Sequence, residues 1–425
     1  MQRDRADQAR GAARNRVYRG NEVSRPRRRA GVPVLSAAET SDRPSVAELL
    51  VGCRVCICAG SGGVGKTTTS AAIALGMAAR GAKVAVVTID PARRLATSLG
   101  LRELGNEPRR IDARRFERAG ISMQGELWAM MLDPKRTFDE LIERLSPDLR
   151  SREEVLSNRI YQELSSAVAG SQEFTAIAKL YELDHEHDFD LIVLDTPPSR
   201  HALDFLEAPT RLTQFFEGRA LQVFLRPTGL GMRLVGRGTG LVFSVLKRVT
   251  GVDLLADLSV FFHSLAGMID GFKERAVQVE ALLRDADTSF LLITSPEPEP
   301  VEEALYFHER LRIAGMRFGG TIVNRVHHHV PGRLDEAELR AALAGELGEE
   351  LAGKVLDSYK EYRALAARDR SAIARVADRL GSTGLVLVPF LDHDVHDLAG
   401  LQEVERHLFG SERAPASPAQ RAAVS

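Results

Sequence analysis

The stretch AGSGGVGKTTTS, residues 59–70, decides the fold. Its segment Gly60 to Thr67 has the spacing GxxxxGK[ST], which joins a buried strand to a helix and binds phosphates. An apolar run precedes it at residues 53–59 and a helical pattern follows at 66–80, as the motif requires. In such loops N–H groups surround the phosphates, the lysine reaches the β- and γ-phosphates, and the next hydroxyl ligates Mg²⁺. The predicted nucleotide-binding residues here are Gly60, Ser61, Gly62, Gly63, Val64, Gly65, Lys66, Thr67 and Thr68.

Short apolar runs recur along the chain and alternate with helical patterns. This alternation predicts an α/β fold, in which a doubly wound, mostly parallel sheet is covered by helices on both faces. The carboxyl ends of the strands would then carry the chemistry. The runs are residues 53–59, 83–90, 190–195, 289–294, 319–324 and 384–389, and the helical patterns include 66–80, 301–314 and 371–380.

The composition predicts one large domain between two disordered ends. Residues 1–30 hold ten arginines and three acidic residues, so 1–47 is interpreted as an arginine-rich arm, with a membrane or nucleic-acid contact as the alternative. Residues 410–425 are interpreted as a disordered tail. The domain between them, 48–409, is expected to carry helical insertions at about 100–185 and 205–284, which together form a subdomain. A formal net charge of −1 gives no argument for a specific nucleic-acid partner.

The three cysteines all lie in the first apolar run, CRVCIC, residues 53–58. Alternation along a strand would send Cys53 and Cys56 to opposite faces, which disfavours a zinc or redox pair. We interpret both, with Cys58, as core residues of a cytoplasmic protein. No stretch has the roughly 20 uninterrupted apolar residues that a membrane-spanning helix needs, although peripheral contact with a membrane stays open.

Two of the runs end in an aspartate at the predicted carboxyl edge of the sheet. Asp90 in TIDPARRL could orient a water that attacks the γ-phosphate, and the alternative role is a helix N-cap. Asp195 in FDLIVLDTPPSRHAL suits a Mg²⁺ site through water, together with Thr67. With Lys66, these two aspartates are the predicted catalytic residues. The predicted switch residues are Asp90, Pro91, Asp195, Thr196, Pro197, Pro198 and His201.

Two further histidine features have competing interpretations. His201 follows the second switch and could sense phosphate, or it could be a satisfied surface histidine. The run of residues 327–329, HHH, could indicate a metal, but adjacent side chains that leave a strand diverge. We therefore expect no metal there.

These motifs together resemble the ArsA family of ATPases, which includes the arsenite-pump ATPase and the ATPase that targets tail-anchored membrane proteins. GSGGVGKTTT resembles the family's deviant Walker A loop, TIDPARRL its switch I, and DTPPSRHALDFLEAP its switch II, over a likeness that covers roughly residues 50–409. The resemblance implies ATP as the substrate, Mg²⁺ as the cofactor and a dimeric assembly. It also implies that Asn324 reads adenine and that Pro296 and Glu297 lie beside the base.

Ser61 departs from this family pattern, in which a lysine at that position crosses to the partner's phosphates. A cation supplied in this way acts like an arginine finger, which is worth about 10³–10⁵ in rate. Three explanations stay open: a heterodimer with a lysine-bearing paralogue, which we prefer; a slow homodimer helped by Arg93, Arg94 or Arg200; or a nucleotide-binding regulatory subunit that hydrolyses weakly or not at all.

The cysteine content also restricts what the family resemblance implies. No cysteine lies outside residues 53–58, so neither a metalloid site nor an intersubunit zinc is expected. The apolar region from about 205 to 272 stands where targeting members bind a client helix, but it has only two methionines, which favours core or dimer interface. We expect hydrolysis to be coupled to client-protein handling or anion transport.

Overall fold

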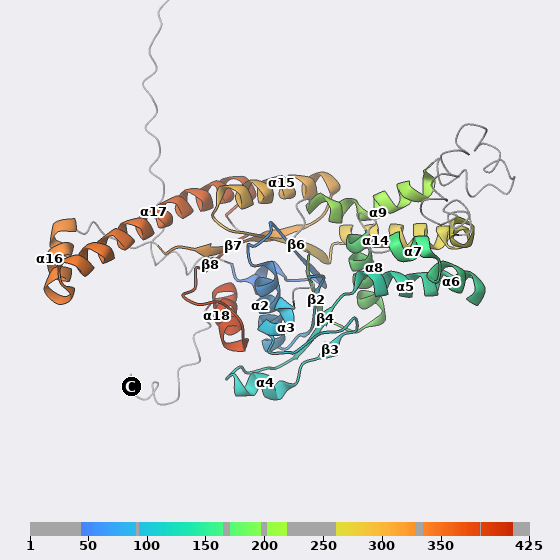
Figure 1. Cartoon of the computed structure of the whole chain (residues 1–425), viewed down its shortest axis with the longest axis horizontal. Coiled ribbons are helices and arrows are strands. Elements are labelled where there is room, and N and C mark those ends of the chain that lie inside the picture. Colours follow the sequence, from blue (N-terminus) through green and yellow to red (C-terminus); the bar gives the residue numbers. More distant parts are fainter. Residues whose placement is uncertain are drawn as a thin grey trace, which may run out of the picture. The chain divides into compact units, whose positions relative to one another are not determined.

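The computed structural model describes residues 44–90, 93–164, 171–196, 202–218, 261–328, 335–382 and 384–410. In this part of the chain, eight strands form one sheet in the order β3-β4-β2-β5-β1-β6-β7-β8. Neighbouring strands run parallel, except for the short β3 on the edge. The sheet confirms the predicted fold class (Figure 1). The strands are β1 (Val55–Ala59), β2 (Lys83–Thr88), β3 (Arg109–Arg110), β4 (Glu126–Met131), β5 (Leu191–Asp195), β6 (Thr288–Thr294), β7 (Phe318–Val326) and β8 (Leu385–Pro389).

The centre of the sheet brings three sequence motifs to one edge. β1 pairs in parallel with β5 on one side and with β6 on the other, and β2 pairs with β5. The carboxyl ends of β1, β2 and β5 therefore lie together, followed by Gly60, Ile89 and Thr196 respectively. This topology places the glycine loop, Asp90 and Asp195 together at the carboxyl edge of the sheet, where parallel α/β sheets bind their ligands.

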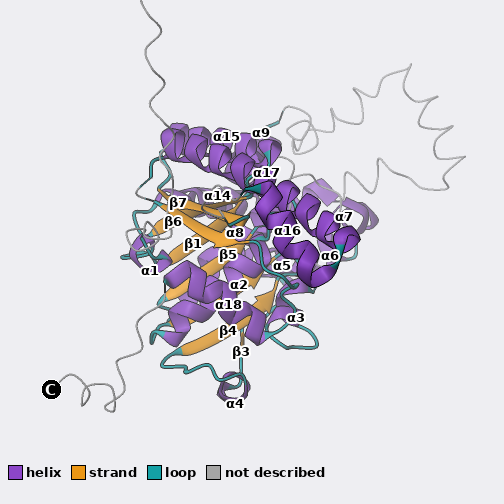
Figure 2. Ribbon diagram, turned by 90° about the vertical axis from the view of Figure 1, so that its left-hand side faces the viewer, coloured by secondary structure: helices purple, strands orange, loops and turns teal. Residues whose placement is uncertain are grey.

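Side chains of the buried strands alternate between two core clusters, one on each face. Val55, Ile57 and Ala59 of β1 enter one cluster, whereas Cys56 and Cys58 enter the other. Figure 2 shows α15 and α17 on one side of the sheet and α2 and α18 on the other. The helices that cover the cysteine side are α1 (Val46–Leu49), α2 (Lys66–Ala79), α3 (Arg94–Ser98), α4 (Ala113–Arg118) and α18 (Leu398–Phe409).

A thicker helical layer covers the opposite face. Its aromatic rings pack together, with Phe138 stacked on Phe272 at 5.6 Å and Phe216 against Phe272 at 5.4 Å between ring centroids. The side chain of Asp133 caps the N-terminus of α5, the first helix of this layer, and Pro134 occupies the first turn of that helix. The layer contains α5 (Pro134–Leu145), α6 (Leu149–Leu156), α7 (Arg159–Leu164), α8 (Ser171–Glu186), α9 (Ala202–Glu217), α14 (Ile269–Arg284) and α15 (Pro298–Ala314).

The last long connection forms a helical hairpin. α17 (Glu349–Leu380) is a single helix of 32 residues, and α16 (Glu336–Leu347) packs along its first part. The C-terminal half of α17 contributes Ile373 and Val376 to a third small core against β7 and β8. The hairpin is thus anchored to the sheet at one end of α17 only (Figure 1).

Several elements differ from their predicted boundaries. Residues 109–131 supply β3, α4 and β4, so the first insertion adds two strands to the sheet, and its run of consecutive helices begins only at Pro134. Val46, inside the predicted arm, is fully buried in the core. Cys53 joins the same cluster as Cys56 and Cys58, contrary to the expectation of opposite faces, because β1 begins at Val55 and alternation does not extend back to Cys53.

Some predicted features lie outside the described residues. They are most of the arm (1–43), most of the tail (411–425) and the central part of the second insertion (219–260). No helix among the described residues is both long and apolar enough to cross a membrane.

Candidate active site

The glycine loop packs against the neighbouring strand ends so closely that two of its positions have no room for a side chain. A Cβ at Gly60 would overlap the carbonyl oxygen of Ile293 at the end of β6, and one at Gly65 would overlap the amide of Asn324. Gly65 also has φ of +91°, a conformation that favours glycine, and it forms the N-cap of α2. The loop therefore keeps its backbone N–H groups at the positive end of α2, where anions bind.

Lys66 lies within this loop and is only 6% exposed. Its Nζ donates to the carbonyl oxygens of Gly60, at 3.0 Å, and Ser61, at 2.8 Å. Burial lowers the pKa of Lys66, and the charges of Asp195 and Asp90 offset this only in part. The ammonium group thus has neutral carbonyl partners, which a phosphate can replace.

Asp195 connects three segments of the site. Its Oδ2 accepts hydrogen bonds from Thr67 Oγ1 at 2.7 Å and from Thr88 Oγ1 at 2.8 Å. The side chain is fully buried, and burial raises its pKa to about 6 against the opposing effect of these hydrogen bonds. Within the described residues, Oδ1 has no hydrogen-bond partner. Hydroxyl and carboxylate oxygens beside a phosphate loop, one of them buried and unpaired, fit a hydrated Mg²⁺.

The first predicted switch begins directly after β2. The backbone N–H of Asp90 donates to Thr88 Oγ1 at 3.1 Å, and Thr88 in turn donates to Asp195. The Asp90 carboxylate lies 4.0 Å from Nε of Arg94, which is itself exposed. Arg93 adopts a left-handed backbone with φ of +56° and precedes α3. Pro91 lies outside the described residues.

The second predicted switch is described only at its start. Thr196 Oγ1 donates to the carbonyl oxygen of Cys58 in β1 at 2.8 Å, which ties the exit of β5 to the strand that leads into the glycine loop. Pro197, Pro198, Arg200 and His201 lie outside the described residues.

The residues expected near the base lie on the neighbouring strands. Asn324 of β7 donates from Nδ2 to the carbonyl oxygen of Val64 at 2.9 Å, so it contacts the loop directly. Pro296, after β6, is buried, and Glu297 is exposed as the N-cap residue of α15. Pro296 and Glu297 follow β6, which pairs with β1, and Asn324 lies near the end of β7, which pairs with β6. The three residues therefore lie on the same edge of the sheet as the glycine loop.

Sequence reasoning missed Thr88 and the histidine contacts. Thr88 ends β2 two residues before Asp90, so a hydroxyl at the carboxyl end of a buried strand was the available signal. The ring Nδ1 of His327 lies 2.8 Å from Oδ2 of the buried Asp369, a contact that joins the end of β7 to α17. His329 lies outside the described residues.

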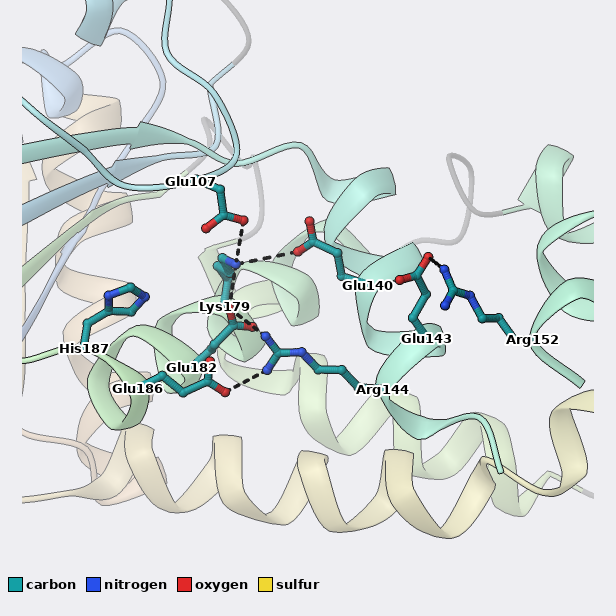
Figure 3. A pocket seen from close by; sticks show the side chains of 9 residues that line it. All are labelled: Glu107, Glu140, Glu143, Arg144, Arg152, Lys179, Glu182, Glu186 and His187. Atoms are coloured by element: carbon teal, nitrogen blue, oxygen red, sulfur yellow. Dashed lines mark hydrogen bonds and ion pairs between the residues drawn. The ribbon is translucent and has the colours of Figure 1, made fainter. Parts of the chain in front are cut away.

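A second polar cluster surrounds Lys179 in the helical layer and was also not predicted. Lys179 is 2% exposed, yet its Nζ lies 2.6 Å from Glu182 and 3.6 Å from both Glu107 and Glu140. It borders a pocket of about 450 Å³ (Figure 3). Burial lowers the pKa of Lys179, but the hydrogen bond and charges of the glutamates outweigh it and raise the pKa overall.

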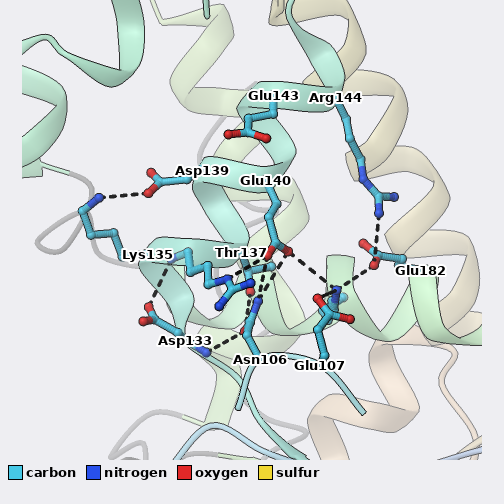
Figure 4. A network of polar contacts seen from close by, with 12 residues as sticks. Asn106, Glu107, Asp133, Lys135, Thr137, Asp139, Glu140, Glu143, Arg144 and Glu182 are labelled. Atoms are coloured by element: carbon cyan, nitrogen blue, oxygen red, sulfur yellow. Dashed lines mark hydrogen bonds and ion pairs between the residues drawn. The ribbon is translucent and has the colours of Figure 1, made fainter. Parts of the chain in front are cut away.

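Asn106 extends this cluster toward the segment that follows α3. Its side chain donates to Glu140 at 3.2 Å and accepts from the backbone N–H of Asp133 at 2.9 Å and from Thr137 Oγ1 at 3.2 Å (Figure 4). The cluster therefore fastens the segment before β3 to the start of α5 and to α8. The charged side chains of this cluster are paired with one another, whereas Lys66 in the glycine loop donates to neutral carbonyl groups.

The fold and the loop geometry together define a P-loop nucleoside triphosphatase. Residues 53–340 match the model of the family described as anion-transporting ATPase. The chain belongs to this family, the ArsA ATPases, and is an ATP-binding ATPase; the resemblance seen in its motifs is confirmed.

Known relatives carry two kinds of name. ATPase GET3 of Malassezia globosa is 25% identical over 308 residues, which are 72% of this chain and 81% of that protein. The putative arsenical pump-driving ATPase 1 of Aquifex aeolicus is 24% identical over 365 residues, 84% of this chain and 79% of that protein. ATPase GET3A of Arabidopsis thaliana is 26% identical over 273 residues, 63% of this chain and 64% of that protein.

Proposed function

We propose that the chain hydrolyses Mg·ATP with Lys66, Asp90 and Asp195 as its catalytic residues. Lys66 and the loop N–H groups stabilise charge on the transferring phosphoryl group, and Asp90 orients the attacking water. Thr67 and, through water, Asp195 would hold Mg²⁺, and the bound ion would supply charge that neutralises the phosphates. The observation that carries this proposal is the buried Asp195, which accepts from both Thr67 and Thr88 and keeps one oxygen unpaired within the described residues.

The same contacts suggest how loss of the γ-phosphate is reported. Asp90 is joined through its N–H to Thr88, and Thr88 is joined to Asp195, so a shift at one aspartate reaches the other through a single hydroxyl. Thr196 extends the connection to β1. In this proposal the switch comprises Asp90, Pro91, Asp195, Thr196, Pro197, Pro198 and His201.

We further propose that the chain acts as a nucleotide-gated dimer, preferably with a lysine-bearing paralogue. Ser61 is half-buried, and its carbonyl oxygen accepts from Lys66. Because its side chain is uncharged, it brings no cation to a partner. In such a heterodimer, the nucleotide site of this chain would receive the lysine of the partner paralogue. A homodimer helped by Arg93 or Arg94 of the described residues, or by Arg200, is the competing arrangement.

Steady-state hydrolysis of Mg·ATP at increasing protein concentration tests this proposal. We compare wild type with Ser61→Lys and use Lys66→Ala as the background. If the missing cation limits the rate, Ser61→Lys raises turnover by about 10³-fold and makes it concentration-dependent. If wild type already turns over well and the substitution adds nothing, the heterodimer proposal fails. If neither variant exceeds Lys66→Ala, a regulatory subunit explains the chain better.

The work coupled to hydrolysis is proposed as client-protein handling or anion transport. The names of the relatives include a pump-driving ATPase for arsenicals, but the three cysteines of this chain are all buried in one core cluster before the glycine loop. We therefore expect arsenite to leave the rate of ATP hydrolysis unchanged. A rise in rate on adding arsenite would overturn this preference.

A further inference from the structure

Thr88, the last residue of β2, is not among the predicted site residues, yet its side chain joins two of them. Its backbone pairs in register with Asp195 of β5, so the two side chains stand next to each other at the carboxyl edge of the sheet. The N–H of Leu132, which follows β4, donates to the carbonyl oxygen of Thr88 at 2.8 Å. Thr88 is therefore held by the strands on both sides of β2 rather than by a loop.

The hydroxyl group of Thr88 is used both as a donor and as an acceptor. It accepts from the backbone N–H of Asp90 at 3.1 Å and donates to Asp195 Oδ2 at 2.8 Å. Because a hydroxyl group has one proton and here gives it to a carboxylate oxygen, the direction of both hydrogen bonds is fixed. A β-branched side chain also has few χ1 rotamers, which keeps the oxygen in place. The hydroxyl group thus fixes the main chain of Asp90 and the carboxylate of Asp195 relative to each other.

The same contact decides which oxygen of Asp195 remains for a ligand. Oδ2 accepts from Thr88 and from Thr67 Oγ1, whereas Oδ1 is buried and has no hydrogen-bond partner within the described residues. Two donors on one oxygen restrict the rotation of the carboxylate about χ2, which is otherwise broad. Of these donors, Thr67 also ligates Mg²⁺ in the proposed function, whereas Thr88 has no second task.

We propose that Thr88 is a positioning residue of the ATPase site, which holds Asp195 in place for a hydrated Mg²⁺ and Asp90 in place for the attacking water. This inference rests on the proposed function and adds to it a residue that acts only through the two aspartates. Loss of the hydroxyl group should therefore weaken whatever depends on Mg²⁺ and on Asp90. Binding of metal-free ATP to the glycine loop should not change.

Thr88→Val tests this inference, because valine has the shape of threonine without the hydroxyl group. We expect the affinity for ATP to weaken by about 10-fold with Mg²⁺ and to stay unchanged in EDTA, and kcat to fall by about 10–100-fold. Exchange of the Asp90 amide hydrogen, followed by mass spectrometry, should become faster, since the amide loses its acceptor. Thr88→Ser keeps the hydroxyl group and should recover most of all three losses.

Thr288→Val is the matched control. Thr288 is as deeply buried as Thr88, at 1% exposure, and its hydroxyl group has no hydrogen-bond partner within the part of the chain that the structure describes. It opens β6, at the opposite edge of the sheet, so its replacement should change none of the measured quantities. Thr88→Ala and Thr88→Ser form a second pair, which differs by the hydroxyl group alone and serves if valine disturbs folding.

Three results would overturn the inference. The first is a wild-type affinity for Mg·ATP in Thr88→Val, and the second is a loss in Thr88→Ser as large as in Thr88→Val, which would assign the effect to packing. The third is weaker binding of ATP in EDTA, which would place Thr88 in nucleotide binding itself. Failure of the proposed function looks different, because wild type would then hydrolyse ATP no faster than Lys66→Ala, while ATP affinity and amide exchange would still test Thr88.

Discussion

Two buried lysines, Lys66 and Lys179, are nearly equal in exposure and opposite in surroundings. Lys66 donates to two carbonyl oxygens, and its pKa is lowered by burial. Lys179 lies among three glutamates, which overcome the effect of burial and raise its pKa. A buried ammonium group whose hydrogen-bond acceptors are all neutral is costly for the fold and available to an incoming anion, whereas one paired with carboxylates is compensated and not available.

The largest effect should come from Lys66→Met. We expect the rate of Mg·ATP hydrolysis to fall by roughly 10²–10³-fold or more, because the charge on the transferring phosphoryl group loses a pre-positioned cation. In the absence of nucleotide the free energy of unfolding should stay equal or rise, since a costly buried charge is removed. Phosphate release and urea unfolding measure the two quantities. A less stable variant would contradict the comparison.

Lys179→Met should have the opposite signature. Removing the cation leaves Glu182 with Arg144 and Glu140 with Arg136 as their remaining, partly exposed partners, so the free energy of unfolding should fall by about 1–3 kcal/mol. Hydrolysis per folded molecule should change far less than in Lys66→Met. Urea unfolding at pH 7.5 gives the first quantity, and rates normalised to the folded fraction give the second. Equal stability of the two methionine variants would remove the distinction between the lysines.

Asp195→Asn tests whether the active site trades stability for function. The pKa of Asp195 is raised from 3.8 to about 6, so its ionised form lowers the folding stability by about 2–3 kcal/mol at pH 8. With a raised pKa in the folded state, this loss is absent below about pH 4 and complete above about pH 6. The variant should therefore be more stable than wild type at pH 8, with a gain that shrinks toward pH 5, and inactive. A pH-independent difference would refute this account.

Glu107→Gln should produce the smallest change. Glu107 is 61% exposed on its side chain and lies 3.6 Å from Lys179, so the pair contributes about 0–1 kcal/mol. Glu182→Gln is the matched variant, because Glu182 is mostly buried and lies at 2.6 Å. We expect urea unfolding to rank Glu182→Gln as clearly less stable. The reverse order would show that distance and burial do not set the strength of these pairs.

The sequence was most informative where chemistry needs a fixed spacing. GxxxxGK[ST] and two strand-terminal aspartates were enough to predict that residues far apart in the chain meet at one sheet edge, and the six apolar runs became β1, β2, β5, β6, β7 and β8. Thr88 and Asp369 could not be found in this way, because a threonine at the end of a strand or an aspartate in a long helix has many uses. Lys179 looks like any surface lysine of an amphipathic helix until its glutamate partners, up to 72 residues away at Glu107, are brought to it by the fold.

The length of α17 has a mechanical consequence. Asp369, which holds His327, stands twenty residues after the start of the helix at Glu349, or about 30 Å along its axis. If the helix moves as a rigid lever, a tilt of about 10° at Asp369 would carry Glu349 and the attached α16 through about 5 Å. A displacement too small to notice at the end of β7 would thus be large at the tip of the hairpin.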